Sequence, residues 1–172
     1  MGSKKLLLGL TMVVLTAAQG SALVSQEPEP SYSPDGAWFA TATLVGLPRP
    51  FPFMDIYTSD ATNQGRSGTV LCTLSVGKFA SPMGLVSMTP TAHGNWIRTA
   101  KNTFAFTAWR ILLDEDGRPV GTAKFWGTVT AGTPDGFTGT MNVELYAADG
   151  TAFGAFNGTT AGRRIAVESE QQ

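Results

Sequence analysis

The stretch that decides the fold is Asn102–Thr160, which reads NTFAFTAWRILLDEDGRPVGTAKFWGTVTAGTPDGFTGTMNVELYAADGTAFGAFNGTT. It holds three Asp-Gly pairs, and runs rich in Thr, Val and aromatic residues lie between them. In such pairs Asp tolerates a turn conformation and Gly supplies the positive φ that follows. The spacing predicts four long β-strands joined by three tight hairpins, at Asp116-Gly117, Asp135-Gly136 and Asp149-Gly150.

Loop length predicts which side chains face inward. A type I turn closed by a glycine bulge gives three-residue loops, Glu115–Gly117 in the first hairpin and Ala148–Gly150 in the third. An odd loop pairs odd-numbered residues with odd-numbered ones, so all four strands are predicted to turn their odd residues to one face. A first loop of two or four residues would instead invert the first strand and bury Arg110.

Polarity supports this rule best on the two middle strands. On the third strand, apolar odd residues such as Met141 and Val143 alternate with polar even ones. On the second strand, Phe125 and its odd neighbours lie opposite Thr and Lys. For the outer strands the rule predicts that Thr103, Ala105, Thr107, Trp109, Ile111, Phe153, Ala155, Asn157 and Thr159 point inward, and that Arg110, Phe104 and Phe106 point outward.

Composition indicates an all-β domain behind an export signal. Of 172 residues, 15% are charged and 20 are glycine, and helix-forming residues are sparse. Lys4-Lys5, the apolar run 6–18 and the small residues 20–22 predict a signal peptide over residues 1–22. We expect an extended lead-in at 23–35, a β-barrel domain at 36–167, a loose tail at 168–172, and a secreted or periplasmic protein. A retained membrane anchor is the alternative.

Charge and cysteine content exclude several classes of function. Removal of residues 1–22 leaves 10 basic and 13 acidic residues, a net charge of −3, and no basic stripe that would attract nucleic acid. Cys72 is the one cysteine, so the chain forms no internal disulfide, and its apolar strand predicts a buried thiol. We expect no cofactor, no metal and no stable membrane insertion after signal removal.

The strands before the meander complete the architecture. Strands are predicted over 36–45, 51–58, 68–75 and 92–99, and the apolar segment 76–91 is interpreted as a lid or an irregular strand. Eight strands in up-and-down order with short connections favour a closed antiparallel barrel, because closure removes exposed edges. The competing fold is a two-sheet sandwich.

Several motifs carry a family resemblance. Gly36-Ala37-Trp38 resembles the opening Gly-x-Trp of lipocalins, in which an Arg of the last strand packs over the Trp; Arg163 or Arg164 would be that Arg here. The segments 93–99, 103–106, 116–117 with 120–122, 137–139 and 162–165 resemble small secreted bacterial barrels of unknown function, which look lipocalin-like or allene-oxide-cyclase-like. The resemblance implies a calycin-type barrel and no catalytic residues that can be carried over.

Two single residues have a catalytic and a structural interpretation. His93, the one histidine, would be a general base at a barrel mouth, but we favour a hydrogen-bonding role where its strand begins. Asp55 lies within the apolar strand 51–58. An inward Asp55 would have a raised pKa and become the best acid–base candidate, but we expect it to point outward. The acidic residues of the turns are interpreted as structural.

The inner set predicts a cavity, because it mixes small residues with large apolar ones and a few polar groups. The hypothesis is a secreted barrel that binds a small hydrophobic ligand. Two alternatives are a cyclase or isomerase acting on a hydrophobic substrate in the same cavity, and a structural or interaction barrel with a filled interior. The predicted ligand-binding residues are Thr107, Trp109, Phe125, Met141, Phe153 and Asn157.

Overall fold

A computed structural model describes residues 31–74 and 77–166 of the chain. The expected signal peptide at 1–22, most of the lead-in at 23–35 and the tail at 168–172 lie outside the described residues. No α-helix occurs in the described part of the chain, and no helix there is long and apolar enough to span a membrane.

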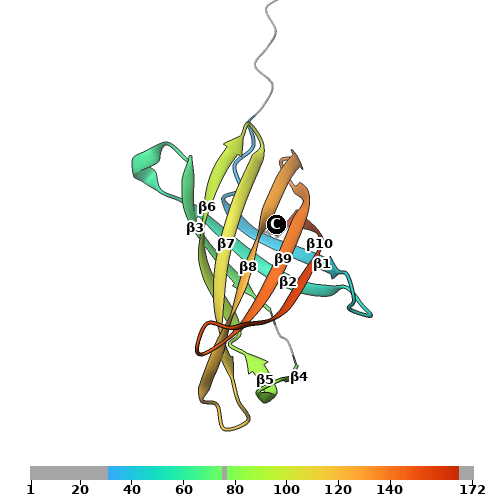
Figure 1. Ribbon diagram of the computed structural model, residues 1–172. Helices are drawn as coiled ribbons and strands as arrows, with labels where there is room; N and C mark the ends of the chain where they lie inside the picture. The colour runs from blue at the N-terminus through green and yellow to red at the C-terminus, as the bar shows by residue number, and fades with distance from the viewer. Residues whose placement is uncertain (1–30, 75–76, 167–172) are drawn as a thin grey trace, which may run out of the picture. The chain divides into compact units, whose positions relative to one another are not determined.

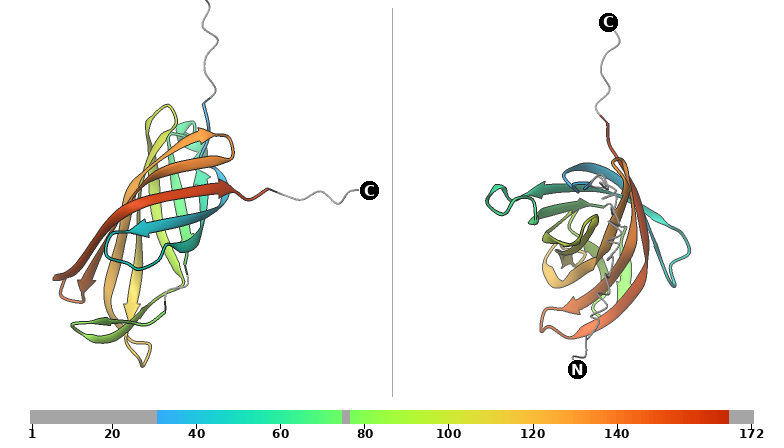
Figure 2. Two further views of the ribbon diagram at one scale, coloured as in Figure 1. Left: turned by 90° about the vertical axis from the view of Figure 1, so that its right-hand side faces the viewer. Right: turned by 90° about the horizontal axis from the view of Figure 1, so that it is seen from above.

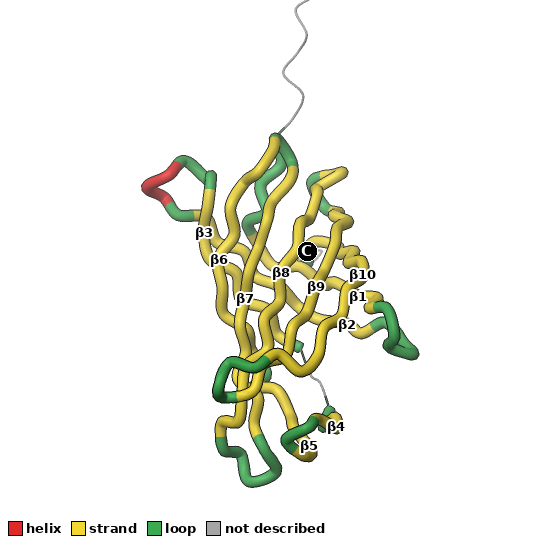
Figure 3. Tube along the Cα trace, in the orientation of Figure 1, coloured by secondary structure: helices red, strands yellow, loops and turns green. Residues whose placement is uncertain are grey.

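Strands make up most of the described chain, with one short 3-10 helix between β2 and β3 (Figure 3). The elements are β1 (Gly36–Leu44), β2 (Phe51–Ser59), η1 (Ala61–Asn63), β3 (Ser67–Thr73), β4 (Phe79–Ser81), β5 (Gly84–Met88), β6 (Thr91–Ala100), β7 (Thr103–Leu113), β8 (Pro119–Thr133), β9 (Gly136–Ala147) and β10 (Ala152–Arg164).

Eight of these strands close into an antiparallel barrel, as predicted (Figure 1). The hydrogen-bonded order is β7-β6-β3-β2-β1-β10-β9-β8, and β8 pairs again with β7 to complete the ring. All eight predicted strands are present. The segment 76–91 contains a small hairpin, β4–β5. It pairs with β7 through Ser87 and Met88 and lies at one end of the barrel (Figure 2, left).

The predicted parity is right for β8 and β9 and wrong for β7 and β10. The three-residue loops are present: Asp114 N–H donates to Arg118 O, and Ala147 N–H donates to Thr151 O. Just past each loop, however, one extra residue enters the ladder, Val120 in β8 and Phe153 in β10. Each of these β-bulges shifts the pairing register by one residue. As a result, β7 and β10 turn their even-numbered residues inward instead of their odd-numbered ones.

The middle hairpin reaches odd-with-odd pairing by a different route. Thr133 pairs with Gly136 across a two-residue loop, and Gly132 is then the extra residue, so Ala131 pairs with Phe137. Gly117 and Gly150 have the predicted positive φ, 78° and 85°, whereas Gly136 is not among the glycines with positive φ. One bulge in each hairpin therefore sets the faces of the whole meander.

One end of the barrel, which we name the closed end, is filled by aromatic rings and covered by residues 31–35. The Trp38 side chain is 1% exposed, donates from Nε1 to Pro34 O at 2.7 Å, and lies 4.3 Å from the Arg164 guanidinium carbon. This confirms the predicted Trp–Arg packing. The Arg164 guanidinium also donates to the Asp35 and Ser33 carbonyls, so it fastens residues 31–35 over the closed end.

Gly36 is required at this position for two reasons. Its φ is +115°, a conformation that L side chains rarely adopt, and a Cβ on it would lie 2.6 Å from Arg164 Nη1. The Gly-x-Trp spacing therefore follows from geometry: the glycine leaves room for the arginine that covers the tryptophan.

Candidate functional site

The opposite end, which we name the mouth, holds a cavity of about 530 Å³. The mouth is bounded by the loops 45–50, 114–118 and 148–151 and by the β4–β5 hairpin. Residues of the strands, and Leu74 just after β3, build the cavity floor and the inner wall, and most of them are nearly inaccessible to solvent. They include Leu44, Leu74, Phe125, Val143, Leu145 and Phe156.

The outer wall comes from two segments that are not part of the closed ring. The β4–β5 hairpin contributes Phe79, Ala80 and Met88, and the loop between β1 and β2 contributes Leu47–Pro50. Arg49, in that loop, is the one charged residue of the lining, and it makes no ion pair within the described part of the chain. The cavity is thus apolar, with a single cation at its rim.

Beneath the cavity floor lies a group of four polar side chains, Asp55, Tyr57, Cys72 and Arg110, which we name the polar centre. The Tyr57 hydroxyl donates to Asp55 Oδ2 at 3.1 Å. The Arg110 Nη2 donates to the Cys72 carbonyl at 2.8 Å and lies 3.7 Å from the Cys72 Sγ. Asp55 and Cys72 face each other in the β2–β3 ladder, so Cys72 links the carboxylate to the guanidinium.

Arg110 is anchored by carbonyls at both ends of the segment that carries β4 and β5. Its Nη1 donates to Leu74 O at 3.0 Å, where β3 ends, and to Thr89 O at 3.3 Å, just before β6. Its guanidinium carbon lies 5.4 Å from the centre of the Phe125 ring. The side chain is 2% exposed. A buried arginine thus holds the base of the hairpin that walls the cavity.

Two atoms of the polar centre are left without hydrogen-bond partners among the described residues: Asp55 Oδ1 and Arg110 Nε. The Asp55 side chain is 5% exposed, and this burial raises its pKa from 3.8 to about 6. The Cys72 thiol, the Tyr57 hydroxyl and the positive charge of Arg110 each lower the pKa, but by less. Burial also raises the pKa of the Cys72 thiol well above its usual value, which keeps it protonated and unreactive.

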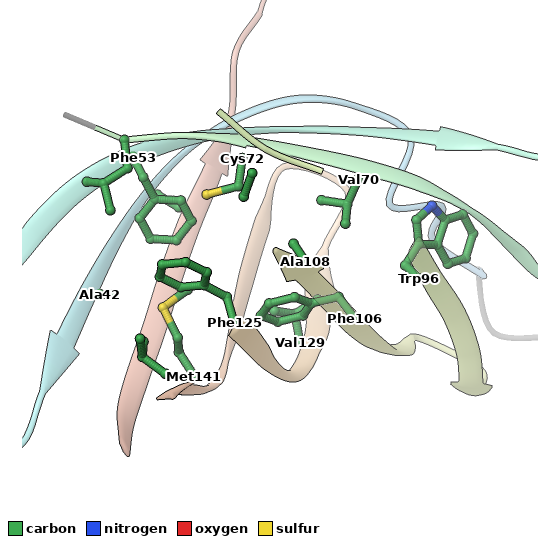
Figure 4. Close-up of a cluster of buried hydrophobic side chains, with 14 of the residues drawn as sticks. Ala42, Phe53, Val70, Cys72, Trp96, Phe106, Ala108, Phe125, Val129 and Met141 are labelled. Carbon is green, nitrogen blue, oxygen red and sulfur yellow. The ribbon is translucent and has the colours of Figure 1, made fainter. Parts of the chain in front are cut away.

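Only a thin partition separates the polar centre from the cavity. Phe125 lines the cavity with its ring and packs under Arg110, and Leu74 lines the cavity with its side chain while its carbonyl accepts from Arg110. Figure 4 shows the Phe125 ring between the side chains of Phe53 and Met141, with Cys72 close by. The cavity and the polar centre are therefore adjacent layers of one interior.

The predicted apolar site residues are placed unequally. Phe125 lines the cavity. Met141 is 3% exposed and lies in the core below the cavity, next to Phe125 (Figure 4). Phe153 is the bulged residue of β10, half-buried against the core and outside the cavity lining. Whether any of them contacts a ligand stays a prediction.

The predicted orientation of Thr107, Trp109 and Asn157 is wrong. All three side chains are on the outer face of the barrel, and Trp109 is 44% exposed and packs against Tyr146 with ring centres 5.8 Å apart. The physical reason is the pair of bulges at Val120 and Phe153, which turn the even residues of β7 and β10 inward. Arg110, predicted to point outward, is for the same reason buried opposite Ala123.

The two candidate acid–base residues, His93 and Asp55, lie on opposite faces of the barrel wall. His93 is exposed on the outer face of β6, opposite Trp109, and does not reach the cavity. Asp55, expected to point outward, points inward, because β2 turns Phe53, Asp55 and Tyr57 to the core and Met54 and Ile56 to solvent. Both faces of β2 are apolar in sequence, so alternation alone did not decide between them.

Comparison with known proteins identifies no family. No protein-family model matches the chain, and no curated protein matches it. Among solved structures, EF1p2_mFAP2b bound to DFHBI has a TM-score of 0.49 and 12% identity, over 76% of this chain and 93% of that one. A redesigned β-barrel, mFAP1, bound to DFHBI has a TM-score of 0.44 and 13% identity, over 76% and 94%. The barrel assignment rests on the strand pairings themselves.

Proposed function

We propose that this protein binds a small apolar molecule in the cavity at the mouth of its barrel. The observation that supports the proposal is the cavity itself, about 530 Å³ with apolar walls and one cation at the rim. Ligand sites in proteins commonly have this size and lining. An interior that served only to stabilise the barrel would be filled by its own side chains, as the closed end is.

Plugging the cavity tests this proposal. Ala80 lines the outer wall and is exposed, so Ala80→Trp places a large ring at the cavity without disturbing the core. Ala161→Trp, on an exposed position of β10 near the closed end, is the matched control. Titration with a panel of apolar fluorophores, followed by the emission of the probe, should give at least tenfold weaker binding for Ala80→Trp and unchanged binding for Ala161→Trp. No binding to the wild type, or equal binding to all three proteins, would contradict the proposal.

The cyclase or isomerase alternative is favoured by one observation, the inward orientation of Asp55. A buried carboxyl group with a pKa of about 6 exchanges protons readily near neutral pH. In this second candidate function, Asp55 would move a proton on an apolar substrate held in the cavity. Native mass spectrometry would first identify a molecule that copurifies. Incubation of that molecule in D₂O should then give deuterium incorporation with wild type and none with Asp55→Asn; equal incorporation would contradict the idea.

We also propose that the protein acts outside the cytoplasm, on the sequence of residues 1–22 alone. Mass spectrometry of the protein recovered from its native source tests this. A mature N-terminus near residue 23 is the expected result, and an intact N-terminus on cytoplasmic protein would contradict it.

A further inference from the structure

We propose that the polar centre is an inner recognition site, which binds a hydroxyl group on the apolar molecule held in the cavity. This inference rests on the proposed binding function and specifies the chemical class of the ligand. Its basis is that two buried atoms of opposite hydrogen-bonding character, Asp55 Oδ1 and Arg110 Nε, have no partner among the described residues. Buried polar groups are nearly always paired, and each unpaired one destabilises the fold.

The remaining atoms of the two side chains are already used. Asp55 Oδ2 accepts from Tyr57, and the two terminal nitrogens of Arg110 donate to the carbonyls of Cys72, Leu74 and Thr89. No ion pair joins Asp55 to Arg110 in the described part of the chain. What is left open is therefore one acceptor and one donor, facing the interior from β2 and β7.

A hydroxyl group fits this combination better than other small polar groups. Its O–H donates to Asp55 Oδ1, and its oxygen accepts from Arg110 Nε–H. A ketone or ether oxygen satisfies only the arginine, and a protonated amine satisfies only the aspartate. A carboxylate would be repelled by Asp55 when that residue is ionised.

The route from the cavity to the polar centre passes Phe125. This ring is the part of the cavity floor that packs under the Arg110 guanidinium, and it lies among apolar side chains (Figure 4). The proposal requires the ring to move aside when the ligand binds. The apolar body of the ligand would remain in the cavity, and its hydroxyl would reach beside Phe125. Leu74 also lines the cavity, and its carbonyl accepts from Arg110, so it is the second residue that joins the cavity to the polar centre.

Three related probes test the inference: 2-naphthol, 2-methoxynaphthalene and naphthalene. They share one apolar body, and only the first can donate a hydrogen bond. Isothermal titration at pH 7.5 should show 2-naphthol binding about tenfold more tightly than 2-methoxynaphthalene, since a hydrogen bond to a charged group is among the stronger ones. Asp55→Leu should abolish this preference while keeping the affinity for naphthalene, and Asp60→Leu, at an exposed position, should leave the preference unchanged.

A second measurement does not depend on the variants. The side-chain N–H signals of arginine in ¹⁵N-labelled wild type should include a buried Arg110 Nε–H that shifts with 2-naphthol and not with naphthalene. Equal affinity for the three probes in wild type would overturn the inference and leave the proposed function standing, because an ordered water would then satisfy the two atoms. Binding of none of the probes would overturn both.

Discussion

The two ends of this barrel are built in opposite ways. At the closed end, Trp38 and Trp96 are 1% exposed and pack against Phe137 and Phe104, with ring centres 5.1 and 5.6 Å apart. Arginines cover both clusters, Arg164 over Trp38 and Arg98 over Phe104. At the mouth, large apolar side chains instead surround about 530 Å³ of open space.

We infer that the closed end mainly stabilises the fold and that the mouth mainly binds the ligand. Aromatic burial and cation–π contacts stabilise the closed end. The mouth has less side-chain packing because it contains the cavity. The polar centre lies between the two ends. Substitutions at the closed end should therefore reduce the free energy of unfolding, whereas substitutions in the outer wall of the cavity should change ligand affinity with little effect on stability.

The largest expected effect is at the closed end. Trp38→Ala removes a ring buried between Arg164 and Phe137 and should lower the free energy of unfolding by about 3–5 kcal/mol. Urea denaturation followed by circular dichroism measures it. Trp109→Ala, on the outer face and 44% exposed, is the control and should cost much less. Similar losses for both would show that the closed end has no special role in stability.

The next largest effect is the pH dependence of the free energy of unfolding, which we expect from Asp55 in the polar centre. Because the pKa of Asp55 is about 6 in the folded protein and 3.8 as a reference, the fold favours the protonated form. The contribution of protonated Asp55 to the free energy of unfolding is therefore complete below pH 4 and is lost as pH rises through 6. The free energy of unfolding falls by about 3 kcal/mol over this range. Asp55→Asn, which stays neutral, should match wild type near pH 4 and be more stable by up to that amount at pH 8.

Chemical denaturation of both proteins at intervals between pH 4 and 8 measures this difference. A constant offset between the two curves would contradict the assignment of a raised pKa to Asp55.

A smaller effect separates two Asp-Gly turns that look alike in sequence. Gly117 has a φ of 78°, so Gly117→Val at the mouth should cost about 1–3 kcal/mol from backbone strain. Gly136, near the closed end, has no positive φ, and a Cβ there would lie 3.0 Å from Thr133 Oγ1 and 4.0 Å from Gly162 O. Gly136→Val should therefore cost less, as thermal melts of both variants would show; the reverse order would contradict the assigned turn conformations.

The smallest effect is at the rim of the mouth. Lys78, just before β4, forms an exposed ion pair with Glu115 at 3.5 Å. Lys78→Ala should change the free energy of unfolding by less than about 0.5 kcal/mol, because exposed ion pairs contribute little. Denaturant titration at low and high salt checks this value. A loss above 1 kcal/mol would show that the β4–β5 hairpin contributes to stability as well as to the cavity wall.

The sequence predicts the strands, the loops and the Trp–Arg pair because these depend on local signals. Alternation, Asp-Gly turns and the Gly-x-Trp motif act over a few residues, and they determine eight strands in meander order. The face of each outer strand depends on something less local, the single extra residues at Val120 and Phe153. No residue type marks these bulges, so the parity rule failed on β7 and β10.

A usable signal for β7 was nevertheless present in its even residues. In the first half of the strand, Phe104 and Phe106 are more apolar than Thr103, Ala105 and Thr107, and both phenylalanines are buried. The presence of Arg110 in the same set concealed this signal, because an arginine is rarely placed in a core without partners. The partners are main-chain carbonyls of β3 and of the segment before β6, which only the folded chain brings within reach.

The pairing of β1 with β10 has a consequence for how the chain folds. Each neighbouring pair of strands within the meander forms from nearby residues, but Trp38 pairs with Arg164, which is 126 positions later in the chain. Contacts so distant in sequence form late and slowly. During synthesis, the edge of β1 that pairs with β10 therefore stays unpaired, and the apolar face of β1 stays exposed, until β10 has left the ribosome. Aggregation during synthesis should be most sensitive to changes that delay this last pairing.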